Sequence, residues 1–481
     1  MKTTLLRLSL NFIALTFLTS QSLSAQTITI DNGAKISVAG DGLAAISCDG
    51  SINIKGTLDL QNKAILKLKG DFIKNGTPAT FSPGNSTVIF EGSGPSQISG
   101  GNIANKTTYS FYNLELNMDA SSSSVSINTT NINAYVTIVN VLNPANGTLT
   151  TNDALNLNNR STSPGYARIA SGNGIIDGGV RVEKRLANTN SNYRQMALPI
   201  SINTPLANPN WGSFSNGITA LLSASVPSAQ NNVFIWDSRD ADGIGGDDYA
   251  HGWRNATQND NTDSSFNIFL SNNGVHNFGL GGSDAVEFNV FGEIKQGDFA
   301  HSLHFTRDPG DNPPTAGFDP VTKGWNLIPN PWVALIDVRK LLIDNVNFTS
   351  EYKAIHVWDA SAPINNGAVY RAILLNGVTQ RTYNTSNSPL DTTVNLAPFQ
   401  SFWVKATAEG QVCNLISSEI QVTKNTGNNF LKKDYDLFRI NAFDQDSLFD
   451  QLVIYFNEQS SREFDLEGDA FYLKSENKNA P

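Results

Sequence analysis

The chain has 481 residues and a formal net charge of −10, and only 16% of its residues are charged. This length predicts two or three domains, and the glycine, serine, threonine and asparagine residues between short apolar runs favour a turn-rich, all-β fold. The acidic balance repels phosphate groups and anionic lipids, so it argues against nucleic acid as a partner and against binding to a membrane surface.

The first 25 residues have the pattern of a secretory signal peptide. Lys2 and Arg7 form a basic segment, an apolar run follows over residues 8–18, and Ala25 offers a cleavage site. The apolar run is too short to span a bilayer, and no cysteine follows it that a lipid could modify. We therefore expect residues 1–25 to be a signal peptide, and the mature protein to be secreted or to reach the outer cell surface after export to the periplasm.

Residues 26–185 repeat one kind of phrase, a short alternating strand that ends in glycine or asparagine. Examples are ITIDNG, SINIKG, TLDLQN, AILKLKG and TVIFEG. Strands this short cannot bury a face alone, but they can stack as rungs around a shared core. The region therefore predicts a β-solenoid of the β-helix kind, with a flat β-sandwich as the alternative. The charged and polar phrase VEKRLANTNSNY interrupts the pattern and places the boundary at residue 186.

Residues 186–412 have longer connections between strand-like phrases such as NVFIWD, AIHVWD and FQSFWVKA. In the last phrase, alternation puts Phe402 and Val404 on one face and Trp403 and Lys405 on the other. This pattern predicts an antiparallel β-sandwich.

The phrase KGWNLIPNPW within this region combines two tryptophans with two prolines. Alternation puts Trp325 and Leu327 on one face of a strand, and Pro329 removes a backbone donor, so the strand should end there. We expect Trp325 to anchor the strand in the sandwich core and Trp332 to be the residue of this phrase to test as a ligand contact.

Residues 413–481 contain the strand-like phrases FRINAF and DQLVIYF, followed by EFDLEGDAFYLKS. Two or three strands are too few for a stable sheet with a covered face. We therefore expect this segment to be an incomplete C-terminal β domain, inside which the sequence stops.

Phrases in all three segments resemble large secreted proteins of Bacteroidota that leave the cell through the type IX secretion system. They are LKGDFIKNGTPATFSPGNSTVIFEG in the first segment, WNLIPNPW and APFQSFWVKA in the second, and DQLVIYFNEQSSREFDLEGDAFYL in the third. The resemblance implies an adhesin-like protein whose partners are the outer-membrane secretion machinery and surface glycans or other envelope proteins. Such proteins end in a C-terminal sorting domain. The sequence up to Pro481 shows none, so we expect it to be cut short before that domain.

The acidic loop DSRDADGIGGDD is the strongest metal candidate. Asp240 and Asp242 have the spacing of a calcium loop, and Asp247 adds a third carboxylate. However, Ser238 and Tyr249 stand where such a loop has its first and last ligands. Calcium is therefore the candidate cofactor, and a solvated acidic turn is the alternative.

The sequence contains few features that are typical of a catalytic site. His301 and His304 would face opposite sides of a regular strand, and no serine-nucleophile or phosphate-loop motif is present. Cys48 and Cys413 have no histidine nearby in the sequence and are expected to be buried small apolar residues. The acidic residues of the solenoid are scattered, mostly beside glycines in turns. We expect no enzymatic activity, although a polysaccharide-degrading β-helix enzyme stays as an alternative because folding can bring two carboxylates together.

Tryptophans supply one more hypothesis. Exposed indole rings can stack on sugars, whereas buried ones fill a sandwich core. The residues concerned are Trp236, Trp253, Trp325, Trp332, Trp358 and Trp403. The sequence therefore predicts a non-enzymatic exported protein, adhesin-like or a display scaffold on a solenoid stalk, with a carbohydrate-binding module on that stalk as the alternative.

Overall fold

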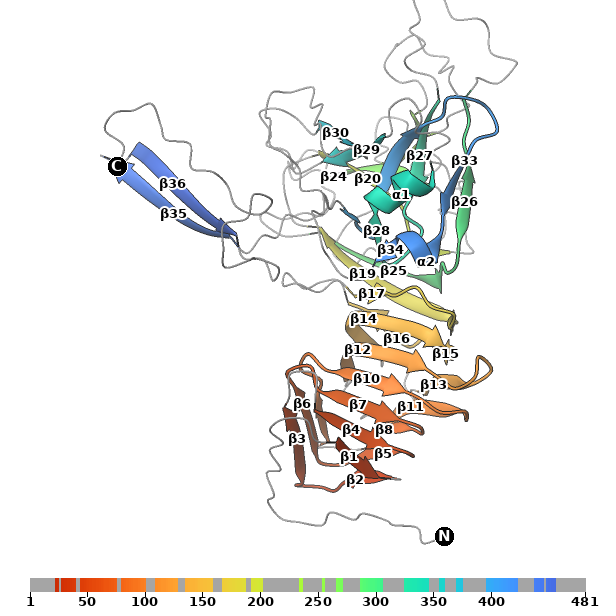
Figure 1. Ribbon diagram of the computed structural model, residues 1–481, viewed down its shortest axis with the longest axis vertical. Helices are drawn as coiled ribbons and strands as arrows, with labels where there is room; N and C mark the ends of the chain where they lie inside the picture. The colour runs from red at the N-terminus through yellow and green to blue at the C-terminus, as the bar shows by residue number, and fades with distance from the viewer. Residues whose placement is uncertain are drawn as a thin grey trace, which may run out of the picture. The chain divides into compact units, whose positions relative to one another are not determined.

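A computed structural model of the protein describes eighteen segments of the chain and is nearly all β, as the sequence predicts (Figure 1). The described residues are 22–25, 27–39, 44–75, 79–100, 109–128, 135–158, 167–186, 192–201, 233–236, 253–255, 265–270, 286–305, 324–345, 354–359, 369–374, 395–422, 437–444 and 447–455. Residues 1–432 form one compact unit and residues 433–481 another. Within the described part, no helix is long and apolar enough to cross a membrane.

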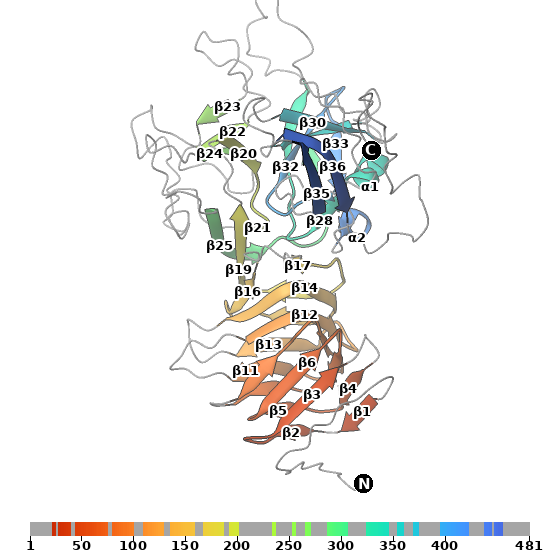
Figure 2. The same cartoon turned by 90° about the vertical axis from the view of Figure 1, so that its left-hand side faces the viewer.

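The N-terminal part is a β-solenoid of about five turns over residues 28–182, built from parallel ladders of short strands (Figures 1 and 2). The longest sheet runs in the order β1 (Ser22–Ala25), β4 (Ala45–Cys48), β7 (Ile65–Leu68), β10 (Thr87–Phe90), β12 (Tyr109–Asn117), β14 (Val136–Asn146), β16 (Leu155–Leu157) and β19 (Gly179–Leu186), with β17 (Arg168–Ile169) paired to β14. A second sheet contains β18 (Ile175–Asp177), β15 (Thr148–Thr150), β13 (Ser124–Asn128), β11 (Ser96–Gly100), β8 (Phe72–Lys74), β5 (Ile52–Ile54) and β2 (Ile28–Ile30). The third contains β3 (Lys35–Ala39), β6 (Thr57–Gln61) and β9 (Thr80–Ser82).

Alternation along each strand explains the solenoid core. In β7, for example, Leu66 and Leu68 are fully buried while their neighbours in the strand are partly exposed. The parallel register then places buried apolar residues of adjacent rungs next to one another. Leu66, for example, lies between Ile46 and Val88. Stacking closes the apolar column that a single short strand could not cover, which is why these phrases fold as rungs.

Both cysteines are confirmed as buried residues in the reduced form. Cys48 lies in register with Leu68 of the next rung, inside the solenoid core. Burial raises the pKa of the Cys48 thiol, and it raises the pKa of Cys413 strongly. Raised thiol pKa values keep both sulfurs protonated and unreactive at neutral pH.

On the outer surface of the solenoid, oppositely charged side chains of adjacent rungs form pairs. Lys69 Nζ lies 2.8 Å from Asp49 Oδ1, and Lys67 Nζ lies 2.9 Å from Glu91 Oε1. Exposed pairs of this kind add little to stability, because water and salt screen them. Their main effect is on register, because a slip of one residue would turn each charged side chain towards the core.

Strand β19 joins the solenoid to the middle domain. It pairs in parallel with β16, and along its whole length it pairs antiparallel with β25 (Val286–Ile294). The short strand β21 (Ile200–Ser201) adds to the other side of β25. The expected boundary between residues 185 and 186 therefore falls inside a strand, and the sheet crosses it without interruption.

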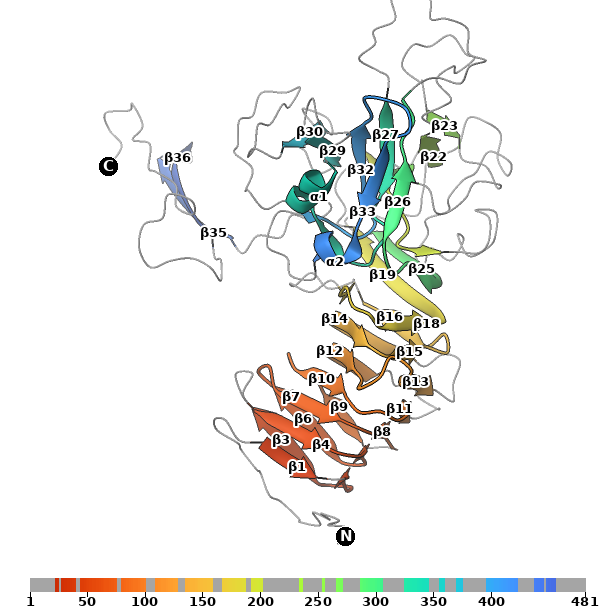
Figure 3. The same cartoon turned by 45° about the vertical axis from the view of Figure 1, so that its right-hand side comes forward.

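Among its described residues, the middle domain adds four small sheets and two short helices, several of which are labelled in Figure 3. The β20 sheet has the order β20 (Asn192–Met196), β24 (Phe266–Leu270), β22 (Val233–Trp236) and β23 (Trp253–Asn255). The β27 sheet has the order β27 (Trp325–Pro329), β32 (Ser401–Lys405), β29 (Ala354–Asp359) and β30 (Val369–Leu374). The remaining elements are β26 (Phe299–Ser302) with β33 (Val412–Leu415), β31 (Asn395–Leu396) with β28 (Leu335–Asp337) and β34 (Gln421–Val422), α1 (Val338–Asp344) and α2 (Ser417–Ile420).

The described residues form two hydrophobic cores. One runs from the solenoid into the β20 sheet, where Val233, Ile235 and Ile268 belong to it. The other lies on one face of the β27 sheet and includes Phe402 and Val404, which confirms the face predicted for these two residues.

The C-terminal boundary differs from the one expected at residues 412 and 413. Strand β33 starts at Val412 and pairs with β26, and β34 pairs with β28, so the chain up to Val422 belongs to the middle domain. The second unit contains one antiparallel hairpin, β35 (Leu437–Asp444) with β36 (Ser447–Tyr455), among its described residues. At the other end, Ser22–Ala25 of the expected signal peptide forms strand β1 beside β4, and residues 1–21 lie outside the described part.

Gly100 offers a test of the solenoid turns. Its φ is +99°, and a Cβ atom there would lie 1.9 Å from the backbone oxygen of Lys74 on the adjacent rung. We expect Gly100→Ala to lower the free energy of unfolding by about 2 kcal/mol or more, because a left-handed conformation costs an alanine about 1–2 kcal/mol before any clash. Gly94→Ala is the matched control, since its Cβ would meet nothing within 4 Å. Equal denaturant midpoints for the two variants would contradict the rung geometry.

Candidate functional site

Four tryptophans from both large sheets of the middle domain pack against one another. We call Trp236, Trp253, Trp325 and Trp403 the tryptophan cluster. Trp236 and Trp253 are directly opposite in the pairing of β22 with β23, while Trp325 and Trp403 come from the adjacent strands β27 and β32. Strand pairing thus explains how residues far apart in the sequence meet.

The rings meet edge to face. Ring centroids lie 4.8 Å apart for Trp236 and Trp403, 5.4 Å for Trp236 and Trp253, 5.9 Å for Trp253 and Trp403, and 6.4 Å for Trp325 and Trp403. Edge-to-face pairs at these distances add about 0.5–1.5 kcal/mol each beyond the area that they bury. The cluster is therefore a preorganised aromatic group whose rings hold one another in place.

Hydrogen bonds fix two of the rings further. The indole N–H of Trp236 donates to the backbone oxygen of Trp325 at 3.0 Å, and that of Trp403 donates to Gln195 Oε1 at 2.7 Å. Both bonds connect the β20 sheet to the β27 sheet, because Gln195 lies on β20. The cluster therefore lies between the two sheets, on the faces that point away from the two hydrophobic cores.

Exposure differs among the four rings. Trp403 is only 5% exposed and forms the base of the cluster. Trp236, Trp253 and Trp325 are each partly exposed. A set of indole rings that is fixed from behind and open in part to solvent has the properties of a sugar-stacking surface.

Polar side chains flank the exposed part. Lys405 lies directly opposite Trp325 in the β27–β32 pair, with its Nζ 5.7 Å from the ring centroid. The His356 ring packs edge to face on Trp325 at 4.9 Å. Burial, and then the positive charge of Lys405, lowers the pKa of His356, so this imidazole is neutral at neutral pH.

The two tryptophans of KGWNLIPNPW have the reverse of their expected roles. Trp332 is 1% exposed, its Nε1 donates to the Gly297 backbone oxygen at 3.0 Å, and its ring packs on Phe299. The prediction of Trp332 as a ligand contact is therefore wrong for this structure, because the ring is in the core. Trp325, expected in the core, is instead partly exposed in the cluster.

Asparagines explain this reversal. Asn326 faces inward, where its Nδ2 donates to the backbone oxygens of His304 and Gly324. Asn330 is fully buried; its Nδ2 donates to two backbone oxygens, and its Oδ1 accepts from the Trp332 backbone N–H. Both buried amides are satisfied, so the phrase is an asparagine-braced strand end that directs Trp332 into the core. The strand ends at Pro329, as predicted.

Trp358 lies on β29 opposite Tyr370 of β30 and is partly exposed.

The proposed calcium ligands Asp240, Asp242 and Asp247 lie outside the described residues. Within the described part, no three His, Cys, Asp or Glu side chains gather in a way that could hold a metal ion.

The two histidines of AHSLHF take part in strand pairing and in a backbone hydrogen bond. His301 lies on β26 opposite Cys413, and the backbone N–H of His304 donates to Asn326 Oδ1 just beyond the strand end.

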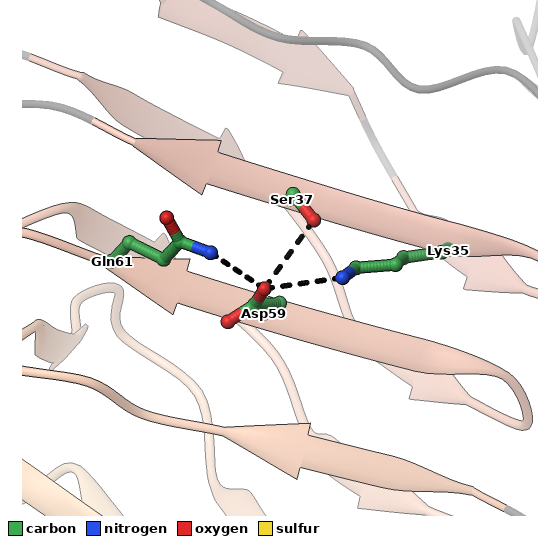
Figure 4. A network of polar contacts seen from close by, with 4 residues as sticks. All are labelled: Lys35, Ser37, Asp59 and Gln61. Atoms are coloured by element: carbon green, nitrogen blue, oxygen red, sulfur yellow. Dashed lines mark hydrogen bonds and ion pairs between the residues drawn. The ribbon is translucent and has the colours of Figure 1, made fainter.

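Several of the described acidic residues of the solenoid hold rungs and turns together. Figure 4 shows the example of Asp59, whose Oδ2 accepts a hydrogen bond from Gln61 Nε2 at 2.7 Å and lies 3.3 Å from Lys35 Nζ. The hydroxyl of Ser37 also points to this oxygen, at 3.5 Å. Asp71 accepts from the backbone N–H of Gln97, which starts the next rung. These contacts make Asp59 and Asp71 parts of the scaffold.

Protonation of His301 should make the middle domain acid-sensitive. Burial, and then the charge of Lys295, lowers the pKa of His301 to about 4, and its buried Nε2 has no hydrogen-bond partner among the described residues. The unfolded chain, with a histidine pKa of about 6.5, therefore binds the proton more tightly than the folded protein. Stability is fully present above pH 6.5 and falls by up to about 3 kcal/mol as the pH drops from about 6.5 to about 4.

His301→Gln is expected to flatten this part of the profile, measured as the free energy of unfolding at several pH values. The same slope between pH 6.5 and 4 in both proteins would show that other groups cause the acid sensitivity.

Comparisons with known proteins identify no family for this chain: no family model matches it, and neither a curated protein nor a solved structure matches it.

Proposed function

We propose that the protein is exported and acts at the cell surface or in the medium as a non-enzymatic, adhesin-like protein or display scaffold. The solenoid is the stalk, and the middle domain carries the contact surface. The observation that carries this proposal is the pairing of β19 with β25, which joins the last rung to the middle domain within one sheet. A contact surface held by a continuous sheet keeps its orientation on the stalk, which suits adhesion and display.

Export rests on the signal-peptide pattern of residues 1–25. The resemblance to proteins of the type IX secretion system supports a Bacteroidota cell and its outer-membrane secretion machinery as partner. Surface glycans or other envelope proteins are the proposed ligands, and the net charge of −10 disfavours nucleic acid.

The non-enzymatic part of the proposal rests on what the described acids do. Asp49 and Glu91 each pair with a lysine, and Asp153 accepts from the Gly179 backbone N–H. Carboxylates that hold rungs and turns together are poorly placed to exchange protons with a substrate. This also makes the alternative of a polysaccharide-degrading enzyme the less supported one.

Protease treatment of intact cells tests export and surface display. The chain, fused at its C-terminus to the sorting domain of a protein that uses the type IX secretion system and expressed in a Bacteroidota host, should be digested on intact cells or found in the medium. The same chain without residues 1–25 should stay inside and be protected. Finding the complete chain only in the cytoplasm would contradict the proposal.

Carbohydrate binding by the middle domain is the second candidate function, and the partly exposed tryptophan cluster favours it. A glycan array, run with and without calcium, tests this candidate. Binding that Trp253→Ala abolishes would support it, and absence of binding in both conditions would count against it. A requirement for calcium would support the proposed ligands Asp240, Asp242 and Asp247.

A further inference from the structure

We propose that the tryptophan cluster and Lys405 together form a binding site for an acidic sugar, one whose pyranose ring carries a carboxylate or sulfate group. The inference rests on the carbohydrate-binding candidate above and adds the chemical class of the ligand. The juxtaposition that carries it is an ammonium group fixed beside a partly exposed indole ring.

Stacking is the first requirement for such a site. A pyranose ring has an apolar face of C–H groups that packs on an indole ring. Trp236, Trp253 and Trp325 present partly exposed rings from three different strands, and Trp403 supports them from below. Because their positions are set by strand pairing, little conformational entropy is lost when a sugar binds.

A positive charge at the right place is the second requirement. Lys405 is held by the register of β27 and β32, which puts it directly opposite Trp325. A sugar that stacks on Trp325 would bring a ring substituent within reach of this ammonium group, and lysine binds carboxylate and sulfate as a point charge. His356, on the same ring, is neutral at neutral pH, so Lys405 supplies the charge here.

Amide groups provide the third feature. Asn267 lies opposite both Gln195 and Phe234 in the β20 sheet, on the side where Gln195 reaches Trp403. Its Oδ1 is buried and accepts no hydrogen bond from the described residues. A buried acceptor without a donor is costly, and a sugar hydroxyl is a suitable donor.

The overall acidity of the chain does not oppose this assignment. The net charge of −10 is spread over 481 residues, and physiological salt screens exposed charges beyond about 8 Å. At the contact distances of a bound sugar, a charge within reach of the ligand acts more strongly than charges further away.

Calorimetric titration of the full-length chain tests the inference. The probes are an oligogalacturonate, a sulfated carrageenan oligosaccharide and a neutral cello-oligosaccharide of equal length. We expect at least one acidic probe to bind about tenfold or more tightly than the neutral one, as a charge-assisted contact allows. Lys405→Gln should remove this preference, while Lys405→Arg should keep most of it. Lys340→Gln is the matched control, because Lys340 is an exposed lysine on α1 of the same domain.

The outcomes separate the two levels of the proposal. Binding of neutral and acidic probes with equal affinity, or a preference that survives Lys405→Gln, would overturn the acidic-sugar assignment and leave carbohydrate binding intact. Failure of all three probes to bind would overturn the assignment and count against carbohydrate binding as well. Binding is also measured for Trp325→Ala and Trp325→Phe. Far-ultraviolet circular dichroism of both variants reports folding, so that a loss of binding can be separated from a loss of folding.

Discussion

Phe72→Ala should lower the free energy of unfolding of the solenoid by about 3–5 kcal/mol, the usual cost of removing a fully buried aromatic ring. Phe72 is 0% exposed and lies between Ile52 and Ile98 of the adjacent rungs. Its ring centroid lies 5.0 Å from that of Phe81 and 5.1 Å from that of Phe111. Three sides of the solenoid therefore meet at this ring, and its loss leaves a cavity that short, hydrogen-bonded rungs cannot close.

Phe72→Leu is the control for this first prediction. Leucine keeps most of the apolar volume, so the expected loss is about 1–1.5 kcal/mol. Denaturant unfolding, followed by circular dichroism, measures both variants. A loss below about 1 kcal/mol for Phe72→Ala would mean that the ring is not in a packed core.

Trp332→Ala should destabilise the middle domain by a similar amount, about 3–5 kcal/mol. The indole ring is 1% exposed and packs on Phe299, and its N–H donates to the Gly297 backbone oxygen. The substitution opens a cavity in the second core and removes that hydrogen bond. The backbone N–H of residue 332 can still donate to Asn330 Oδ1, but the indole ring that this contact positions in the core is gone.

Trp325→Ala is the informative comparison, since it changes the other tryptophan of the same phrase. Its ring is partly exposed, so its removal should cost clearly less stability than the removal of Trp332. Thermal unfolding of the two variants side by side gives the answer. A larger loss of stability for Trp325→Ala would restore the original expectation that Trp325 is the core anchor.

The solenoid could be predicted because its signal is local. Each rung has a two-residue alternation and a turn residue, and stacking is the arrangement that covers every inward face. The same alternation predicted that Phe402 and Val404 share one face, and both lie in the second hydrophobic core. The burial of both cysteines was predicted separately, because neither has a histidine nearby in the sequence, and it is confirmed.

The roles of Trp325 and Trp332 could not be predicted in this way. Alternation separates Trp325 from Asn326 but does not say which of them faces the core, and hydrophobicity favours the tryptophan. The inward position of Asn326 depends on the backbone oxygens of His304 and Gly324, and the approach of His304 is set by tertiary packing. The best available signal was the repeated asparagine in WNLIPN, since buried amides commonly brace irregular strand ends.

The tryptophan cluster and the domain junction were missed for a related reason. Trp236 and Trp403 are separated by a long stretch of sequence, and only the packing of two sheets brings them to 4.8 Å. Likewise, the charged residues 182–185 suggested the end of a domain, whereas they pair with β25 of the middle domain. Pairing between distant strands is not encoded in the pattern of either strand alone.

The central claim is that the solenoid and the middle domain form one continuous β structure that holds the tryptophan cluster on its stalk. Hydrogen–deuterium exchange of the backbone amides in β19 tests this claim most directly. Residues 180–182 pair with both β16 and β25, and this predicts that their amides exchange as slowly as those of the inner solenoid strand β12. Exchange of these amides as fast as in an unpaired linker would contradict the account.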